Sequence, residues 1–298
     1  MGFLKQPRIR IILFGTVLVL FTLFVVLDTF VIPRSYASTE QSEGTALEES
    51  AGTITSSDSS YQDNNISITV TNCRQDNTTI YVAEITLADP SLLNTALAQN
   101  TFGKNVTETT SEMAKDNNAI LAVNGDFYGA QNKGYVIRNG VLYRDTASSQ
   151  DQEDLVIWSD GSFGIVKEGD VTAEELIEKG AAQVLSFGPG LVENGQITVS
   201  QNQEVDKAKV SNPRTAIGII DNLHYVIVVS DGRTEESSGL SLYQLASYMQ
   251  QLGVKTAYNL DGGGSSTLYF NGKVLNNPTS NGKSNQERSV SDIVYIGY

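Results

Sequence analysis

The sequence is poor in the residue types on which several common functional sites depend. Among its 298 residues there is one cysteine, Cys73, and one histidine, His224. A single cysteine cannot form an intramolecular disulfide, so the core alone must stabilise the fold, and we expect Cys73 to be buried within it. A zinc site of the usual composition is not expected, and the one histidine has no recognisable nucleophile near it in the sequence.

Basic residues are also few. The chain has 20 Lys and Arg against 34 Asp and Glu, a formal net charge of −14. Binding to nucleic acid would require a basic stripe, so we expect no nucleic-acid partner. We expect no cofactor or metal either, although the many carboxylates leave a bound Ca²⁺ or Mg²⁺ as an open alternative.

Long hydrophobic runs are confined to the N-terminus. Residues 11–27 are uncharged and mostly apolar, and Lys5, Arg8 and Arg10 precede them. A run of this length can span a bilayer, and the basic flank favours a cytoplasmic N-terminus. We therefore expect residues 1–34 to be a signal-anchor and the protein to be a single-pass protein of the cell membrane with its C-terminal domain extracellular.

A cleaved signal peptide is the alternative for this segment. Ser35-Tyr36-Ala37 resembles a small-residue cleavage site. The apolar run is longer than the usual h-region of ~7–15 residues, which favours the anchor.

Two further regions follow. Residues 35–62 are rich in Ser, Thr and Glu, and the stretch 38–60 has no Lys or Arg, a composition typical of a disordered tether. The remaining residues, 63–298, are enough for one domain with a sizeable core. We expect this to be one catalytic domain.

Short β-type runs separated by two-residue turns dominate that domain. The runs lie at 66–70, 80–87, 119–123, 135–138, 141–143, 155–158, 163–166, 215–220, 225–229, 254–260, 267–270 and 292–296. Turn pairs such as Asn139-Gly140 and Asn194-Gly195 favour antiparallel hairpins. Helices are expected after Thr109, Thr172 and Ser241, the last two of which open capping boxes. The sequence thus predicts an α+β fold with a mixed, largely antiparallel sheet and a few packed helices.

The stretch 259–267, Asn-Leu-Asp-Gly-Gly-Gly-Ser-Ser-Thr, has a composition that no packing requirement explains. It places a carboxylate, Asp261, before three glycines and two serines. Glycines let a ligand approach the backbone, whose amides can then hold an anion. The candidate site residues here are Asn259, Asp261, Gly262, Gly263, Gly264, Ser265 and Ser266. A glycine-rich turn with a capping aspartate is the plainer alternative.

Four more stretches place acids, amides or arginines at predicted strand ends. They contribute the candidates Asn124, Asp126, Arg214, Asp231, Arg233 and Arg288. Each has a plainer interpretation as a turn, a strand start or a surface ion pair. If the strands are neighbours, however, three carboxylates and three arginines meet in one cleft.

That mixture suits cleavage at an anomeric carbon beside a phosphate. One carboxyl group protonates the leaving oxygen while another activates water or attacks the sugar. The planar guanidinium of arginine binds phosphate with two parallel hydrogen bonds.

The motifs Asn124-Gly-Asp-Phe-Tyr, Pro213-Arg-Thr-Ala-Ile-Gly, Asp231-Gly-Arg, Asn259-Leu-Asp-Gly-Gly-Gly-Ser and Arg288-Ser-Val-Ser resemble, in this order, those of the phosphodiester glycosidase family. The resemblance covers about residue 119 to the end of the sequence. It implies hydrolysis of the glycosidic C1–O bond of a sugar-1-phosphodiester, with the three aspartates as the catalytic candidates and the other ten residues binding substrate. The expected partner is a sugar-phosphate-containing glycan or exopolysaccharide of the cell surface. A protein that binds anionic glycan during exopolysaccharide assembly without hydrolysing it is the alternative.

Overall fold

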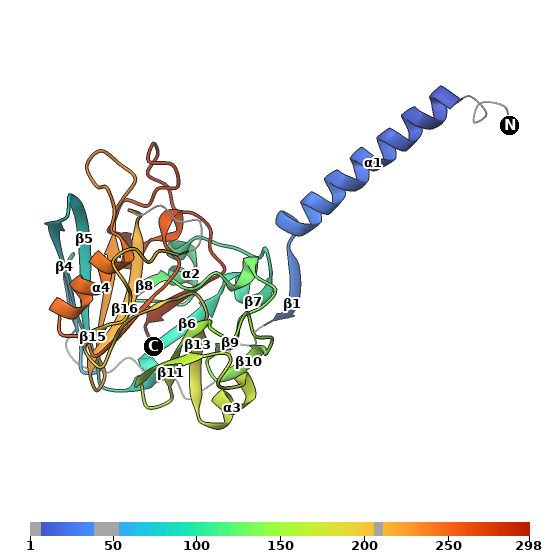
Figure 1. The fold of residues 1–298 in the computed structure, drawn as a ribbon. Helices are drawn as coiled ribbons and strands as arrows, with labels where there is room; N and C mark the ends of the chain where they lie inside the picture. Colours follow the sequence, from blue (N-terminus) through green and yellow to red (C-terminus); the bar gives the residue numbers. More distant parts are fainter. Residues whose placement is uncertain (1–6, 39–53, 206–210) are drawn as a thin grey trace.

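The computed structural model describes residues 7–38, 54–205 and 211–298. Helix α1 (Pro7–Phe30) projects from a body built of β-sheets with one short helix against each of the three larger sheets (Figure 1). Every strand pairing among the described residues is antiparallel. The predicted α+β class with largely antiparallel pairing is confirmed.

The largest sheet has nine strands. In spatial order they are β15 (Gln196–Ile197), β14 (Gly190–Glu193), β18 (Thr256–Asn259), β16 (Arg214–Asp221), β17 (His224–Ser230), β5 (Thr78–Leu87), β4 (Ile66–Gln75), β3 (Ser60–Gln62) and β2 (Thr55–Ser56). Its central strand β17 is apolar without alternation, as a strand covered on both faces should be.

Two five-stranded sheets pack against it. One has the order β10 (Val141–Arg144), β9 (Val136–Arg138), β13 (Ala181–Leu185), β11 (Glu153–Trp158) and β12 (Phe163–Lys167). The other has the order β20 (Lys273–Val274), β19 (Leu268–Phe270), β8 (Leu121–Asn124), β21 (Asp292–Ile296) and β6 (Leu93–Leu97). Short 3-10 turns, η2 (Pro90–Leu92), η3 (Ala98–Asn100), η4 (Tyr128–Ala130) and η5 (Gly263–Ser265), lie between strands.

The main core lies between these sheets. It joins Ile227 and Tyr258 of the large sheet to Val123 and Leu155 of the smaller ones. On the outer faces, α4 (Leu242–Gln251) covers the large sheet, and α2 (Thr110–Asp116) and α3 (Ala173–Glu178) each cover a smaller one. All three helices begin with a capping box, which satisfies amide groups that the first turn leaves without partners.

The hairpin turns follow from their residue types. Asn139 and Gly140 have φ of 51° and 75°, and Asn194 and Gly195 have φ of 50° and 74°. Two positive values in succession define the turn whose twist matches antiparallel strands, and Asn-Gly adopts them most readily.

The region expected to be a tether, 35–62, has paired strands at both ends. Most of β1 (Arg34–Ser38) lies in it and pairs with β7 (Thr101–Lys104), while β2 and β3 at its far end belong to the large sheet. Residues 39–53 lie outside the described part of the chain. The expectation that Cys73 is buried is wrong: its position is near the end of β4, and its side chain is exposed.

Within α1, residues Leu13–Phe30 have a mean hydropathy of 2.3 and are not buried by the body. The helix is therefore long and apolar enough to cross a membrane, a property that signal sequences share.

Candidate functional site

The polar stretches singled out in the sequence lie at the ends of strands from two facing sheets. In the large sheet Arg214 pairs with Ser230, and Ala216 pairs with Asn259. In the five-stranded sheet that contains β8 and β21, Asn124 pairs with Ile293. The loops that follow β8, β17 and β18 therefore meet the segments that precede β16 and β21.

Asn124 ties the two sheets together at this point. Its buried amide donates a 2.6 Å hydrogen bond to the main-chain carbonyl of Asp261, and its oxygen accepts one of 2.9 Å from the Thr215 hydroxyl. The amide of Asp261 also donates to the carbonyl of Gly125 at 3.2 Å. Asn124 therefore fixes the start of the glycine loop rather than facing solvent.

Asp261 is the carboxyl group at the centre of this region. Its Oδ2 accepts 2.6 Å and 3.2 Å hydrogen bonds from the Ser265 hydroxyl and the Arg288 guanidinium. Burial raises the pKa of Asp261, and Arg288 and Ser265 oppose that rise. A carboxyl group in such surroundings can hold a proton more readily than one in water.

Two arginines converge beside it. The Arg288 side chain is 44% exposed and also contacts the Ser265 hydroxyl through Nε at 3.0 Å. Arg233 donates to the carbonyl of Ser280 at 2.8 Å and to the side chain of Asn212. Burial and the nearby charge of Arg288 lower the pKa of Arg233. An anionic ligand would offset the repulsion between these two cations.

The glycines allow this close packing. Gly263 has φ of +63°, and a Cβ atom there would lie 2.6 Å from Nη2 of Arg233. A Cβ atom on Gly264 would lie 2.3 Å from Oγ of Ser280, and one on Gly262 would lie 2.9 Å from the carbonyl of Pro213. Any side chain at these three positions would displace a neighbour.

Three polar atoms of the same stretch have no hydrogen-bond partner within the described residues. They are Oδ1 of Asn259, Oγ of Ser266 and Oγ1 of Thr267, all fully buried. The other end of the Asn259 amide donates to the carbonyl of Gly188 at 2.8 Å.

Arg214 lies next to this group, near Arg233 and Gly262, but its guanidinium binds other partners. Its buried guanidinium forms an ion pair with Glu204 and donates to the carbonyl of Leu240 at 3.0 Å. Burial lowers its pKa, and Glu204 opposes the shift. These contacts hold the segment that precedes α4.

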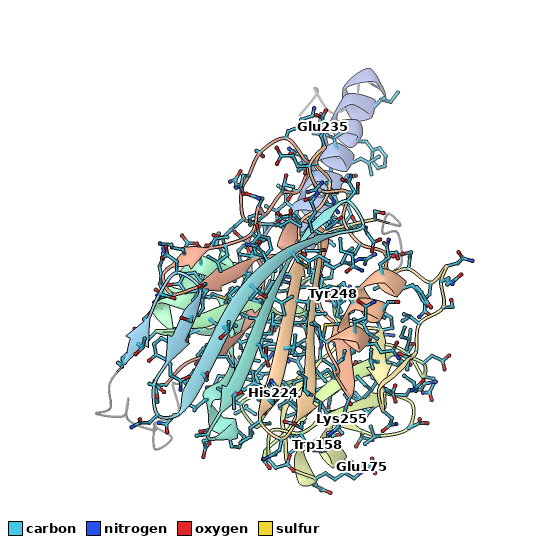
Figure 2. All side chains as sticks on the ribbon, turned by 90° about the vertical axis from the view of Figure 1, so that its left-hand side faces the viewer. Trp158, Glu175, His224, Glu235, Tyr248 and Lys255 are labelled. Atoms are coloured by element: carbon cyan, nitrogen blue, oxygen red, sulfur yellow. The ribbon has the colours of Figure 1, made fainter. Side chains whose placement is uncertain are left out.

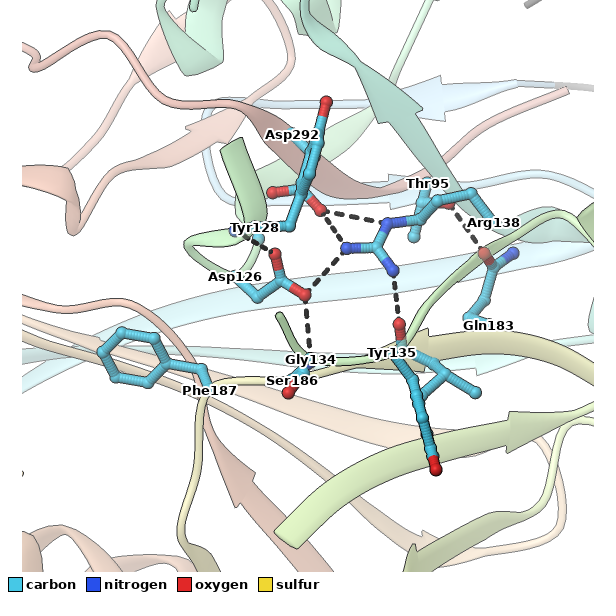
Figure 3. A network of polar contacts seen from close by, with 12 residues as sticks. Thr95, Asp126, Tyr128, Gly134, Tyr135, Arg138, Gln183, Ser186, Phe187 and Asp292 are labelled. Carbon is cyan, nitrogen blue, oxygen red and sulfur yellow. Dashed lines mark hydrogen bonds and ion pairs between the residues drawn. The ribbon is translucent and has the colours of Figure 1, made fainter. Parts of the chain in front are cut away.

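Asp126 lies in a separate buried network, shown in Figure 3. Its Oδ2 accepts from Arg138 at 2.8 Å and from the amide of Ser186 at 2.9 Å, and its Oδ1 accepts from the amide of Tyr128. Arg138 also binds Oδ2 of Asp292 through Nη2 at 2.7 Å and through Nε at 3.1 Å. The network is fully enclosed, since the side chains of Asp126 and Asp292 are each 0% exposed.

Asp231 contacts neither Asp261 nor the Asp126 network and binds a different loop. Its two carboxylate oxygens accept from the amide and the side chain of Asn277 at 2.8 Å and 3.1 Å. Asp231 thereby holds the start of the loop 276–286, which supplies Ser280 to Arg233.

Sequence reasoning missed several residues of this region. Arg138 and Asp292 were overlooked because each stands in a predicted strand, although both are polar residues at strand ends, the signal that identified the others. Asn212, Asn277 and Ser280 belong to segments with no distinguishing composition.

The rest of the described residues contains no metal-binding group, and its main hollow lies away from Asp261. No group of three or more His, Cys, Asp or Glu there could hold a metal ion. A hollow of about 440 Å³ lined by Trp158, Lys167 and Glu193 lies over β11, β12 and α3, among residues that take no part in the network around Asp261.

The fold is that of a known class. The profile of the phosphodiester glycosidase family matches residues 117–297, and the chain belongs to that family. The matched part contains all the candidate residues.

Curated relatives agree with this assignment. The SPbeta prophage-derived uncharacterized protein YomE of Bacillus subtilis (strain 168) is 35% identical over 201 residues, 66% of this chain and 31% of that protein. N-acetylglucosamine-1-phosphodiester alpha-N-acetylglucosaminidase of Homo sapiens is 30% identical over 210 residues, 63% of this chain and 39% of that protein. The chain therefore spans between 31% and 39% of the length of these relatives.

Solved structures show the same fold. The catalytic domain of zebrafish N-acetylglucosamine-1-phosphodiester alpha-N-acetylglucosaminidase, auto-inhibited by its pro-peptide, superposes with a TM-score of 0.62 at 21% identity, covering 90% of this chain and 89% of that one. A hypothetical protein from Synechocystis superposes with a TM-score of 0.54 at 16% identity, covering 78% and 62%.

Proposed function

We propose that this protein hydrolyses the glycosidic C1–O bond of a sugar-1-phosphodiester in a cell-surface glycan, from a domain held at the outer face of the cell membrane by α1. The observation that carries the proposal is the contact of a buried carboxyl group, Asp261, with Arg288, beside a second arginine, Arg233. Family membership supports the reaction class.

In this mechanism Arg233 and Arg288 bind the phosphate and Asp261 lies beside it. As the C1–O bond breaks, its electron pair goes to the phosphate oxygen, which takes a proton from Asp261. A water oxygen forms the new bond to C1 and gives up its proton to a second carboxyl group. The products are the free sugar and a phosphomonoester.

Asp261 suits the acid role because burial raises its pKa, while Arg288 and Ser265 fix its orientation. The second carboxyl group of the reaction is Asp126 or Asp231. Both are enclosed by hydrogen bonds from the protein, so either would act only after a rearrangement. The Gly262–Ser266 segment and Asn259 line the same region. The segment supplies donors to the sugar or the phosphate, and Oδ1 of Asn259 can accept a hydrogen bond from a sugar hydroxyl.

The test is release of sugar from UDP-GlcNAc and from several aryl sugar-1-phosphodiesters by the full-length protein in detergent. Asp261→Asn keeps the shape of the side chain and removes its proton, so we expect a loss of at least ~100-fold in kcat, the usual contribution of general acid catalysis. Asp221→Asn is the matched control, because Asp221 is exposed at the opposite end of β16.

Sugar release by the wild type that Asp261→Asn abolishes, with binding of the substrate retained, supports the proposal. Wild-type protein that releases no sugar from any of these donors, yet binds anionic glycan, would be a binding protein instead.

A further inference from the structure

The partners of Asp261 are polar. Ser265 and Arg288 contact its carboxyl group, and Arg233 lies beside them. These groups suit a phosphate and the oxygen atoms of a sugar. A pyranose ring also has a face of C–H groups, and ligand pockets cover such a face mainly with apolar and aromatic side chains. A sugar bound beside Asp261 therefore also needs an apolar surface.

The single tryptophan of the sequence does not supply that surface. Trp158 is half-buried and lines the hollow over β11 and β12. Figure 2 places it, like Lys255, toward the lower end of the body. Glu235, two residues after Arg233, lies at the upper end of the same view. Because Trp158 is remote from the loop that carries Arg233, the surface must come from other residues.

Phe127 is an exposed ring close to the candidate site. It follows Asp126 in the loop after β8, and its side chain is 39% exposed. In residues 54–205 and 211–298 no other aromatic side chain is exposed to this extent. Two residues earlier, the carbonyl of Gly125 accepts a 3.2 Å hydrogen bond from the amide of Asp261. Burial of this ring by a ligand would be favourable.

Phe187 is a second ring, in the segment between β13 and β14. Before it, the amide of Ser186 donates to Oδ2 of Asp126 at 2.9 Å. The amide of Phe187 itself donates to the hydroxyl of Tyr258 at 2.9 Å. The ring is half-buried against the main core, and Figure 3 shows it pointing away from Arg138. The main chain is thus fixed while part of the ring stays accessible.

The two residues after Phe187 bind the stretch that carries Asp261. The carbonyls of Gly188 and Pro189 accept from the side chain and the amide of Asn259 at 2.8 Å and 3.2 Å. Oδ1 of the same side chain is buried and has no partner among the described residues. A buried acceptor without a donor is costly, and a sugar hydroxyl would satisfy it. The segment of Phe187 therefore adjoins an atom suited to a sugar.

One hydrogen bond brings the two phenylalanines onto neighbouring segments. Phe127 follows Asp126, Phe187 follows Ser186, and the 2.9 Å bond joins the two preceding residues. Each phenylalanine also lies within two residues of a carbonyl that binds the 259–261 stretch. An exposed ring and a half-buried ring therefore stand next to the polar site.

We propose that Phe127 and Phe187 form an aromatic wall on which the C–H face of the substrate's pyranose ring packs while the arginines bind its phosphate. This inference rests on the proposed function. Packing removes the C–H groups and the rings from water and adds dispersion contacts between them. The wall selects pyranosyl phosphodiesters whose sugar has one face uninterrupted by axial hydroxyl groups.

Kinetics of paired variants test the wall. Leu at either position keeps an apolar side chain and removes the aromatic face, whereas Tyr keeps that face. The substrate is the donor that the wild type cleaves fastest among UDP-GlcNAc and the aryl sugar-1-phosphodiesters. Phe127→Leu and Phe187→Leu should each raise KM about tenfold with little change in kcat, because the sugar packs equally before and during bond cleavage. The two Tyr variants should keep KM close to the wild-type value.

Phe163→Leu is the matched control. The ring of Phe163 is also half-buried and packs on Tyr225 with centroids 5.4 Å apart, near the start of β17, whereas the Arg233 loop follows the end of that strand. This variant should keep wild-type kinetics, and urea unfolding measures the stability of all five. An unchanged KM in either Leu variant of the wall, or an equal rise in Phe163→Leu, would contradict the proposal.

Product inhibition separates the wall from the phosphate site. Phe187→Leu should raise the inhibition constant of the free sugar about tenfold and leave that of inorganic phosphate unchanged, and Arg288→Lys should do the reverse. Equal weakening of both inhibitors by Phe187→Leu would mean that the ring only supports the loop, which would overturn the inference.

The outcomes also distinguish this inference from the proposed function. Wild-type protein that cleaves none of the donors would overturn both. Cleavage that neither Leu variant of the wall affects would overturn the aromatic wall alone and leave the hydrolase intact.

Discussion

At the scale of single residues, the lack of a side chain at Gly263 leaves room for the guanidinium of Arg233. The φ of +63° at this position and its contact with Arg233 are separate reasons for glycine. Gly140 has a similar φ of +75°, but a Cβ atom there would meet no atom of the described residues within 4 Å. Alanine at either position should cost about 1 kcal/mol of stability, because its Cβ atom disfavours the left-handed backbone conformation that each position requires.

Only Gly263→Ala should also reduce activity, because its Cβ atom displaces the Arg233 guanidinium. We expect kcat/KM to fall by about tenfold, equivalent to 1.4 kcal/mol, and Gly140→Ala to retain the wild-type value. Steady-state kinetics and urea unfolding of the two variants check this. Equal activity in both would show that Arg233 does not bind the substrate.

Asp292 should make the stability of the protein depend on pH. Burial and the adjacent Asp126 raise its pKa to about 8, Arg138 opposes that rise, and the nearby Asp261 adds to it. Among the residues that the structure describes, no donor lies within hydrogen-bond distance of its buried Oδ1 to stabilise a charge there. The folded state therefore keeps a proton that the unfolded chain loses near pH 4.

A raised pKa gives stability that is complete below the unfolded pKa and is lost as pH rises toward the folded one. Between pH 4 and about 8, wild-type unfolding free energy should fall more steeply than that of Asp292→Asn, by up to about 1.4 kcal/mol per pH unit for one proton. Urea unfolding across this range measures the difference. Parallel pH profiles for the two proteins would show that Asp292 is ionised throughout.

At the scale of elements, the loop 276–286 is held in place by Asp231. If Asp231 serves this loop alone, Asp231→Asn should weaken substrate binding through Ser280 and Arg233, and KM should rise several-fold more than kcat falls. If Asp231 is the second carboxyl group of the reaction, kcat should fall by ~100-fold or more. The separate kcat and KM values decide between these roles, with Asp126→Asn measured alongside.

The elements also show what the sequence could and could not predict. Strands with strong apolar runs, such as β17, and hairpins with Asn-Gly turns were predictable because local chemistry determines them. The strand β13, with Gln183 in its middle, was missed, as was β1, whose pairing with β7 depends on tertiary contact. The start of α4 was predictable from its capping box.

For the candidate site, the sequence identified the strand ends but not their partners. Asp261 and the glycines could be chosen because a carboxylate stands directly before three glycines and two serines, and Arg288 because it precedes a predicted strand. That the glycines also make room for Arg233 and Ser280 could not be foreseen, because it depends on how distant loops pack. The pairing of Arg214 with Glu204 could not be foreseen, because it depends on how a loop folds back across the sheet. The same holds for the enclosure of Asp126 by Arg138.

At the scale of the whole molecule, the site exists because two sheets face each other. Asn124, at the end of β8, binds both Thr215 of the nine-stranded sheet and the main-chain carbonyl of Asp261. The carboxyl group of Asp261 is therefore positioned by both sheets. The main core lies directly beneath, between the same two sheets. Loss of packing in that core would therefore shift the two sheets and change the distances between the site residues.

Proteolysis of intact cells can test how the whole molecule is placed in the membrane. The basic N-terminal flank and the apolar span favour an extracellular body that stays attached. Protease added to intact cells should then cut between residues 38 and 60 and give a domain-sized fragment on a denaturing gel, with the N-terminal stub left in the membrane. Because β1 pairs with β7, part of that fragment should stay on the cells and be released by Gly103→Ala. Full-length protein that is cut only after lysis would reverse the orientation, and intact body in the medium beginning at residue 38 would show that the segment is a signal peptide.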